Sequence, residues 1–91
     1  MSKAYKFNQF TLRVEMVESL ELYVKQGIPC GSFLESALCN NFKDTVAGAD
    51  AENIQNLPAL AGYMYWEMPA NSQGSPELVK SWLKSFQEQE T

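Results

Sequence analysis

The sequence contains no histidine, and this absence removes the commonest general base and the commonest metal ligand of proteins. It has only two cysteines, Cys30 and Cys39, and their spacing does not match a zinc site. A mostly helical stretch between them would hold their Cα atoms beyond disulfide reach, so we expect two free thiols, with Cys39 packed. No acidic cluster resembles a calcium-binding loop. The sequence therefore predicts neither a metal nor a cofactor.

Two kinds of catalytic group are possible in principle, the thiol of Cys30 as a nucleophile and paired carboxylates. Cys30 lies just before a predicted helix, whose dipole would lower the pKa of a thiol. No histidine is present to activate it. The carboxylates fall mostly on solvated helix faces or in first turns, where they serve solubility and the helix dipole. We therefore expect a protein that is not an enzyme.

Positive charge and long apolar runs are also scarce. The chain has seven basic residues, scattered along its length, and a net charge of −4, which argues against non-specific binding of nucleic acid. No apolar run approaches the ~20 residues of a membrane span. The first ten residues, MSKAYKFNQF, do not form an apolar signal segment. We expect a cytoplasmic protein without a membrane partner.

Apolar residues recur at helical spacing along most of the chain, which predicts an all-α fold of four to five short helices. We expect a single domain over 1–91, with an N-terminal arm at 1–10 and a fraying tail at 87–91. The first helix is predicted from Thr11 to Gln26. Gly27 occupies the position of a left-handed C-cap, and Pro29 prevents the helix from continuing.

The second helix is predicted from Ser32 to about Gly48. Ser32 and Glu35 have the spacing of a capping box, in which the serine is the N-cap. Apolar residues then repeat every four positions along this helix. They are Leu34, Leu38, Phe42 and Val46.

The third helical stretch opens at Asp50 or soon after and ends before Pro69. Pro58 interrupts it, and two readings stay open: the proline kinks one long helix, or Asn56 caps a fresh helix beside it. A loop rich in turn-forming residues follows. The last helix begins with Ser75 as cap and Pro76 at its first position. Its predicted apolar stripe consists of Leu78, Val79, Trp82, Leu83 and Phe86.

Two helix starts carry a Gly-Ser pair, Gly31–Ser32 and Gly74–Ser75. Bare N–H groups and the dipole make a helix start a ready anion site, and a preceding glycine allows close approach of a ligand. The alternative is ordinary capping, in which each glycine only relaxes the entering turn. Arg13 and Lys80 are the cations that would accompany an anion.

Four consecutive residues, Tyr63, Met64, Tyr65 and Trp66, cannot all face one small core, because each helical residue turns by ~100°. Some of them must meet another helix, a second subunit or a ligand. Tyrosine and tryptophan suit such half-wet sites. A small domain with crowded aromatics favours association, so we expect a homo-oligomer.

The segments GIPCGSFLESAL and YMYWEMPANSQGSPELVKSWL resemble a group of small tailed-phage and prophage accessory proteins of unassigned function. The shared motifs are I-P-x-G-S-F-L, an aromatic helix ending in proline, and G-S-P-E. The resemblance runs from about Arg13 to Trp82. Where the group often has proline this chain has Cys30, and where an aromatic or histidine often precedes the second Gly-Ser it has Gln73. The resemblance implies a phage-type protein working in bacterial cytoplasm, by analogy against host defence.

Three classes of function remain at this stage. The first is sequestration of a small anionic, nucleotide-like host molecule, with phosphates at the Gly-Ser helix starts and a base on Tyr63, Tyr65 or Trp66. The second is a protein–protein inhibitor or adaptor that covers a host protein with an acidic and aromatic surface. The third is a structural or regulatory phage component without a ligand. The candidate ligand-binding residues are Gly31, Ser32, Tyr63, Tyr65, Trp66, Gly74, Ser75, Arg13 and Lys80.

Overall fold

The first element of the chain is a β-hairpin, which the all-α prediction missed. A computed structural model describes residues 3–89 of the protein. Strand β1 (Tyr5–Phe7) pairs antiparallel with β2 (Phe10–Leu12), and the closing pair is Phe7 with Phe10. Asn8 takes the positive φ of 56° that a two-residue turn requires, and asparagine tolerates it. Most of the predicted N-terminal arm is therefore ordered, and Met1 and Ser2 lie outside the described residues.

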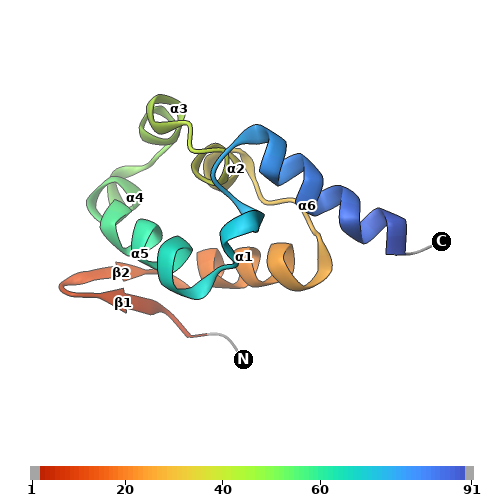
Figure 1. The fold of residues 1–91 in the computed structure, drawn as a ribbon. Helices are drawn as coiled ribbons and strands as arrows, with labels where there is room; N and C mark the ends of the chain where they lie inside the picture. The colour runs from red at the N-terminus through yellow and green to blue at the C-terminus, as the bar shows by residue number, and fades with distance from the viewer. Residues whose placement is uncertain (1–2, 90–91) are drawn as a thin grey trace.

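Six α-helices follow the hairpin in the described part of the chain, so the fold is mostly helical (Figure 1). A short 3₁₀ turn, η1, joins the last two of them at Ala70–Ser72. The α-helices are α1 (Val14–Gln26), α2 (Ser32–Leu38), α3 (Phe42–Ala47), α4 (Ala51–Gln55), α5 (Leu57–Glu67) and α6 (Pro76–Gln89).

Helix α1 begins later than predicted and ends where predicted. Its first predicted residue, Thr11, belongs to β2 instead. Gly27 closes the helix with φ 67° in the left-handed region, and its N–H donates to the Tyr23 carbonyl oxygen at 3.1 Å. The N–H of Ile28 donates to the Leu22 carbonyl oxygen, which completes the C-cap.

The second predicted helix is two helices in the structure. Asn40 has a positive φ of 61°, which a continuous helix does not allow. Asn41 then caps α3, because its side-chain oxygen accepts from the N–H of Asp44 at 3.2 Å. The break turns α3 away from the line of α2, so the predicted four-residue stripe is wrong beyond Leu38. Phe42 is 75% exposed instead of buried.

The capping box predicted at Ser32 is also wrong. Gly31, in extended conformation, is the N-cap of α2, and its carbonyl accepts the first helical hydrogen bond from Glu35. Ser32 is already the first helical residue. The end predicted at Gly48 is confirmed, since this glycine is the C-cap of α3.

The question raised by Pro58 has a clear answer. Asn56 stands between α4 and α5 as the N-cap of α5, and Pro58 lies in the first turn of α5, where its missing N–H breaks no helical bond. The asparagine side chain does not cap the helix. It accepts from the N–H of Thr11 at 2.8 Å and donates to the carbonyl of Glu52, which ties the hairpin to the α4–α5 junction.

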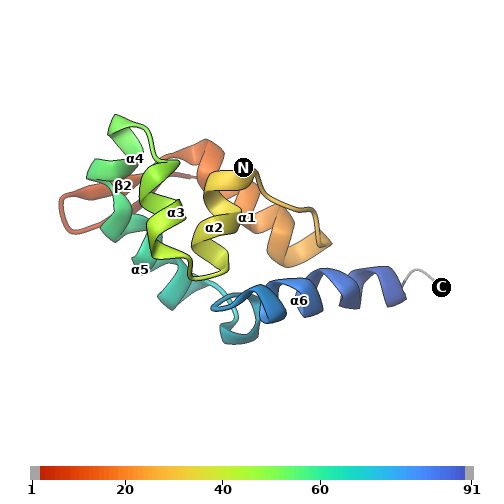
Figure 2. The same ribbon diagram turned by 90° about the horizontal axis from the view of Figure 1, so that it is seen from above.

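The start of α6 is as predicted. The Ser75 hydroxyl accepts from the N–H of Leu78 at 3.1 Å, and Pro76 opens the helix. The helix continues to Gln89, so residues 87–89 of the predicted fraying tail are helical; residues 90–91 lie outside the described part. Helix α6 projects beyond the rest of the molecule, as both ribbon views show (Figures 1 and 2).

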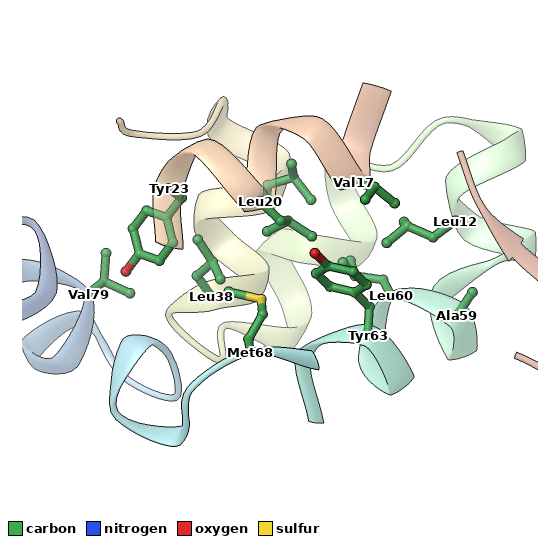
Figure 3. Packing of buried hydrophobic residues seen from close by; sticks show 11 residues of the cluster. Leu12, Val17, Leu20, Tyr23, Leu38, Ala59, Leu60, Tyr63, Met68 and Val79 are labelled. Carbon is green, nitrogen blue, oxygen red and sulfur yellow. The ribbon is translucent and has the colours of Figure 1, made fainter. Parts of the chain in front are cut away.

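One hydrophobic core joins the hairpin, α1, α2, α5 and the start of α6 (Figure 3). Leu20 and Leu38 are almost fully buried at its centre. The Tyr23 hydroxyl donates to the Ser72 carbonyl at 2.6 Å, so the polar end of this buried ring is satisfied. The remaining members of the core are Leu12, Val17, Leu34, Ala59, Leu60, Tyr63, Met68 and Val79.

Candidate functional site

An open groove of about 350 Å³ lies between the α2–α3 pair and α5. Helices α2 and α3 run side by side here (Figure 2). Two aromatic rings with large exposed surfaces, Phe42 and Tyr65, line the groove. Its apolar lining is Ala37, Leu57, Leu60, Ala61 and Met64. Its polar lining is Asn40, Asn41, Thr45 and Gln73.

Helix α5 supplies one wall of the groove through simple helical periodicity. The lining residues at 57, 60, 61, 64 and 65 have the spacing i, i+3, i+4, i+7 and i+8, which places them on one face of a helix. Ala59, Gly62 and Tyr63 lie between these positions; they are buried and do not line the groove. Helix α5 therefore serves the core with one face and the groove with another.

The opposite wall follows from the helix break at Asn40–Asn41. A continuous helix would have kept Phe42 on the face of Leu34 and Leu38, whereas the break brings it to the groove. Thr45 supports this wall, because its buried hydroxyl donates to the Asn41 carbonyl at 2.6 Å. The asparagine pair that ends one helix and starts the next thus shapes the site.

The polar side chains of the groove differ in how many of their hydrogen-bonding atoms are already bonded within the protein. The Asn41 amide is used by Asp44, both through its oxygen and through a 2.8 Å bond from its nitrogen. Gln73 donates through Nε2 to the Met64 carbonyl at 3.0 Å, which orients the amide and leaves its Oε1 as an acceptor. Asn40 is exposed at the edge of the groove and carries both a donor and an acceptor.

Charge is missing from the groove. None of its lining residues, all within the described part of the chain, is an aspartate, glutamate, lysine or arginine. The arrangement can hold an uncharged, partly aromatic group and offer it a few hydrogen bonds.

The second Gly-Ser pair begins at the groove. Gly74 and Ser75 directly follow Gln73, which lines it. Gly74 adopts φ 122°, a conformation that favours glycine, and its N–H donates to the carbonyl of Leu38 at 2.7 Å. This N–H is therefore already in a hydrogen bond with the last residue of α2, and the Ser75 hydroxyl caps α6.

The first Gly-Ser pair lies at the other end of α2. Gly31 and Ser32 are exposed, and no atom approaches within 4 Å of the position of a Cβ on Gly31. Seven helical residues, about 10 Å at 1.5 Å per residue, separate this start from the end that binds Gly74. The two pairs do not form one anion site within a single chain.

The aromatic residues of α5 are divided between the core and the surface. Tyr63 is buried and meets Tyr5 edge to face, with ring centroids 5.2 Å apart. Trp66 is 67% exposed and packs edge-on against Tyr65 at 4.7 Å, but it does not line the groove. Of the aromatics predicted to bind a ligand, only Tyr65 faces this site.

The two predicted cations are elsewhere. Arg13 contacts Glu52 at 3.1 Å, Asp50 at 3.8 Å and Glu15 at 3.6 Å, so it joins the end of the hairpin to α4. Lys80 is exposed on α6, past the first turn that Ser75 caps. Neither side chain lines the groove.

Cys30 has no sign of activation. Burial, followed by the charge of Glu35, raises the pKa of its thiol to about 11, which is the opposite of the effect expected from a helix dipole. Burial raises the pKa of Cys39 as well. Both cysteines are free, and Cys30 donates weakly to the Ser19 carbonyl at 3.6 Å.

Sequence reasoning missed Phe42, Asn40 and the apolar face of α5 as parts of a site. The paired asparagines were an available signal, since asparagine both caps helices and tolerates positive φ. Within the described residues no cluster of cysteine and acidic groups is arranged to hold a metal ion. In the same part of the chain, no helix has the length and apolar character of a membrane span.

Comparisons with known proteins add no relative. No protein-family model matches the chain, and neither the curated proteins nor the solved structures contain a significant match.

Proposed function

We propose that this protein is a non-enzymatic binding protein that sequesters a small nucleotide-like host molecule stoichiometrically, with the base held in the groove between α2–α3 and α5. The observation that carries the proposal is the groove itself, an uncharged space of about 350 Å³ lined by the rings of Phe42 and Tyr65. This volume lies within the range of about 300–1,000 Å³ of small-molecule sites.

The chemistry of the lining suits a planar heteroaromatic group. Exposed aromatic rings provide stacking surfaces, and stacking of a base on such a ring contributes about 1–3 kcal/mol. The Gln73 Oε1 and the Asn40 amide supply an acceptor and a donor for the edge of a base. An apolar lining with few placed polar groups is typical of ligand sites.

The phosphates of such a ligand belong outside the groove, because no cation lines it. The start of α6, at Pro76, comes three residues after Gln73 and carries the positive end of a helix dipole, with Lys80 on the same helix. Glu77 in its first turn reduces this attraction. We therefore expect the base to contribute most of the affinity and the phosphates to contribute less.

The proposal that the protein binds a ligand without catalysis rests on its side-chain chemistry. The chain lacks histidine, and the pKa of Cys30 is raised, so its thiol stays protonated at neutral pH. The proposed setting, a phage-type accessory protein acting in bacterial cytoplasm against host defence, is supported by the I-P-x-G-S-F-L and G-S-P-E motifs alone.

A thermal-shift screen of linear and cyclic nucleotides tests the proposal. At 100 times Kd a ligand adds roughly 2.7 kcal/mol to the stability, which a domain of this size reports as a clear rise in Tm. Tyr65→Ala should weaken binding about 10- to 100-fold because it removes one stacking ring, whereas the matched control Tyr65→Phe should keep most of the affinity. A panel without any stabilising compound, on folded protein, contradicts the proposal.

The start of α2, predicted from Gly31 and Ser32, is a separate candidate position for an anion and does not line the groove. Gly31 leaves free space beside the first-turn N–H groups of α2, so a phosphate can approach them. The exposed carboxylate of Glu35 in that turn opposes an anion. A shift in Tm that survives Tyr65→Ala and disappears with Gly31→Val would move the ligand to this end of α2.

A protein partner is the second candidate, favoured by a specific observation: Trp66 exposes 67% of its surface outside the groove. Tryptophan is enriched among the residues that dominate binding at protein interfaces. An inhibitor or adaptor would cover a host protein with this aromatic surface. A null nucleotide screen, combined with a 1:1 complex with one host protein that Trp66→Ala abolishes, would favour this function.

A further inference from the structure

We infer that the groove is half of a binding site and that a second copy of this chain closes it. The inference rests on the ligand site proposed above and adds the partner that completes it. Three aromatic rings carry the argument, Phe42 and Tyr65 in the groove and Trp66 beside it; we call them the aromatic rim.

The openness of the groove is the first argument. Phe42 and Tyr65 line it, yet they remain 75% and 74% exposed. A base resting in the groove would cover part of each ring and leave the rest in water. Ligand sites usually enclose about 70–90% of their ligand, and one chain does not provide that enclosure here.

The exposed area of the aromatic rim is the second argument. A large aromatic side chain carries roughly 150–250 Å² of coverable surface. With Trp66 at 67% and the other two rings near 75% exposed, the rim offers on the order of 400 Å² per copy. A standard interface buries ~800 Å² per partner, so these three side chains supply about half of what a stable dimer needs.

Charge does not oppose a second copy at this face. Each chain carries a net charge of −4, so two copies associate readily only through a face without opposed carboxylates. The groove has no charged lining residue. The charged residues within two positions of the rim in sequence are Lys43, Asp44 and Glu67, which differ in sign, and Asp44 is already bonded to Asn41.

A two-fold dimer through this face presents the aromatic rim of each copy to that of the other. The groove of one chain is then covered by rings of its partner, and Trp66, which lies outside its own groove, reaches a position to contribute to its partner's site. A dimeric site therefore requires Trp66, whereas a site within one chain does not.

Sedimentation velocity of the purified protein between 1 and 100 μM, without added ligand, tests the inference. We expect a dimer for the wild-type protein, and a loss of at least 10-fold in dimer affinity for both Trp66→Ser and Phe42→Ser. The control is Ile54→Ser, which removes another exposed apolar side chain, on α4 and outside the groove, and should leave the dimer intact. Circular dichroism checks that each variant is folded.

Each outcome decides the matter. A wild-type monomer at 100 μM overturns the inference without any variant, and a nucleotide that stabilises this monomer would leave the proposed function standing. Dissociation by Trp66→Ser but not by Phe42→Ser also overturns it, because the second copy then does not cover the groove. A dimer lost in both variants, with no nucleotide bound, supports the closed groove and counts against the proposed ligand.

Discussion

At the residue scale, Gly27 connects the end of α1 to α6. Its φ of 67° closes the helix, and a Cβ at this position would lie 2.5 Å from Cγ of Phe86. The ring of Phe86 in turn packs against Trp82, with centroids 5.8 Å apart. A glycine is therefore required twice here, by the backbone conformation and by the ring beside it.

Gly27→Ala should lower the free energy of unfolding by about 2–5 kcal/mol. Left-handed backbone strain contributes about 1–2 kcal/mol, and overpacking against the ring contributes about 1–3 kcal/mol. In a Phe86→Ala background the same change should cost only the backbone part, and urea unfolding of the four proteins in this double-mutant cycle measures the difference. Equal costs in both backgrounds would show that the ring does not restrict position 27.

Single residues also show where sequence reasoning succeeds. The roles of Gly27 and Ser75 follow from local capping chemistry, and both are confirmed. Ser32 failed because the glycine before it can serve as the N-cap equally well. No local sequence signal distinguishes Tyr63 from Tyr65. Only the packing of α5 decides that Tyr63 is buried and Tyr65 is exposed.

At the scale of elements, the hairpin is tied to the helices by a hydrogen bond from Asn56, by the ion pairs of Arg13 and by packing against α5. The Asn56 oxygen accepts from the N–H of Thr11 on the outer edge of β2, and Arg13 adds ion pairs to α4 just beyond that strand. A two-stranded hairpin is marginally stable on its own, so its order depends on such contacts and on the packing of β1 and β2 against α5.

Asn56→Ala should destabilise the protein by about 1–3 kcal/mol, because the partly buried Thr11 N–H loses its acceptor. Hydrogen exchange at the Thr11 amide should accelerate more than exchange in α6, which does not depend on this bond. The matched control is Asn71→Ala at an exposed position, where little change is expected. Unaltered protection of Thr11 in the Asn56 variant would contradict this account of the hairpin.

The elements differ in how well the sequence predicts them. The alternation of Tyr5, Phe7, Phe10 and Leu12 around a central Asn-Gln is a strand signal, but it is too short to stand out beside long helical patterns. The four-residue spacing of apolar residues hid the break at Asn40. Phe42 continues this spacing in the sequence, but in the structure it is exposed and does not join the buried stripe. Capping signals predicted the ends of α1 and α3 and the start of α6 because they depend only on near neighbours.

At the scale of the whole molecule, the chain is slightly extended. Its radius of gyration of 12.8 Å compares with about 12 Å for a compact domain of this length, and its extents are 43 × 31 × 19 Å. The projecting helix α6 accounts for the long dimension (Figure 1). The groove arises only when α2, α3 and α5 are packed together, which is why no local pattern in the sequence predicted it.

The central claim, a small ligand enclosed between two copies, is tested most directly by native mass spectrometry of the protein produced in bacteria and purified without added ligand. The account predicts twice the 10.3 kDa chain mass plus a small molecule that denaturation releases. The Tyr65→Ala protein should lose most of the small molecule, and the Trp66→Ser protein should appear as a bare monomer. A wild-type spectrum that shows only the ligand-free 10.3 kDa monomer would contradict the account.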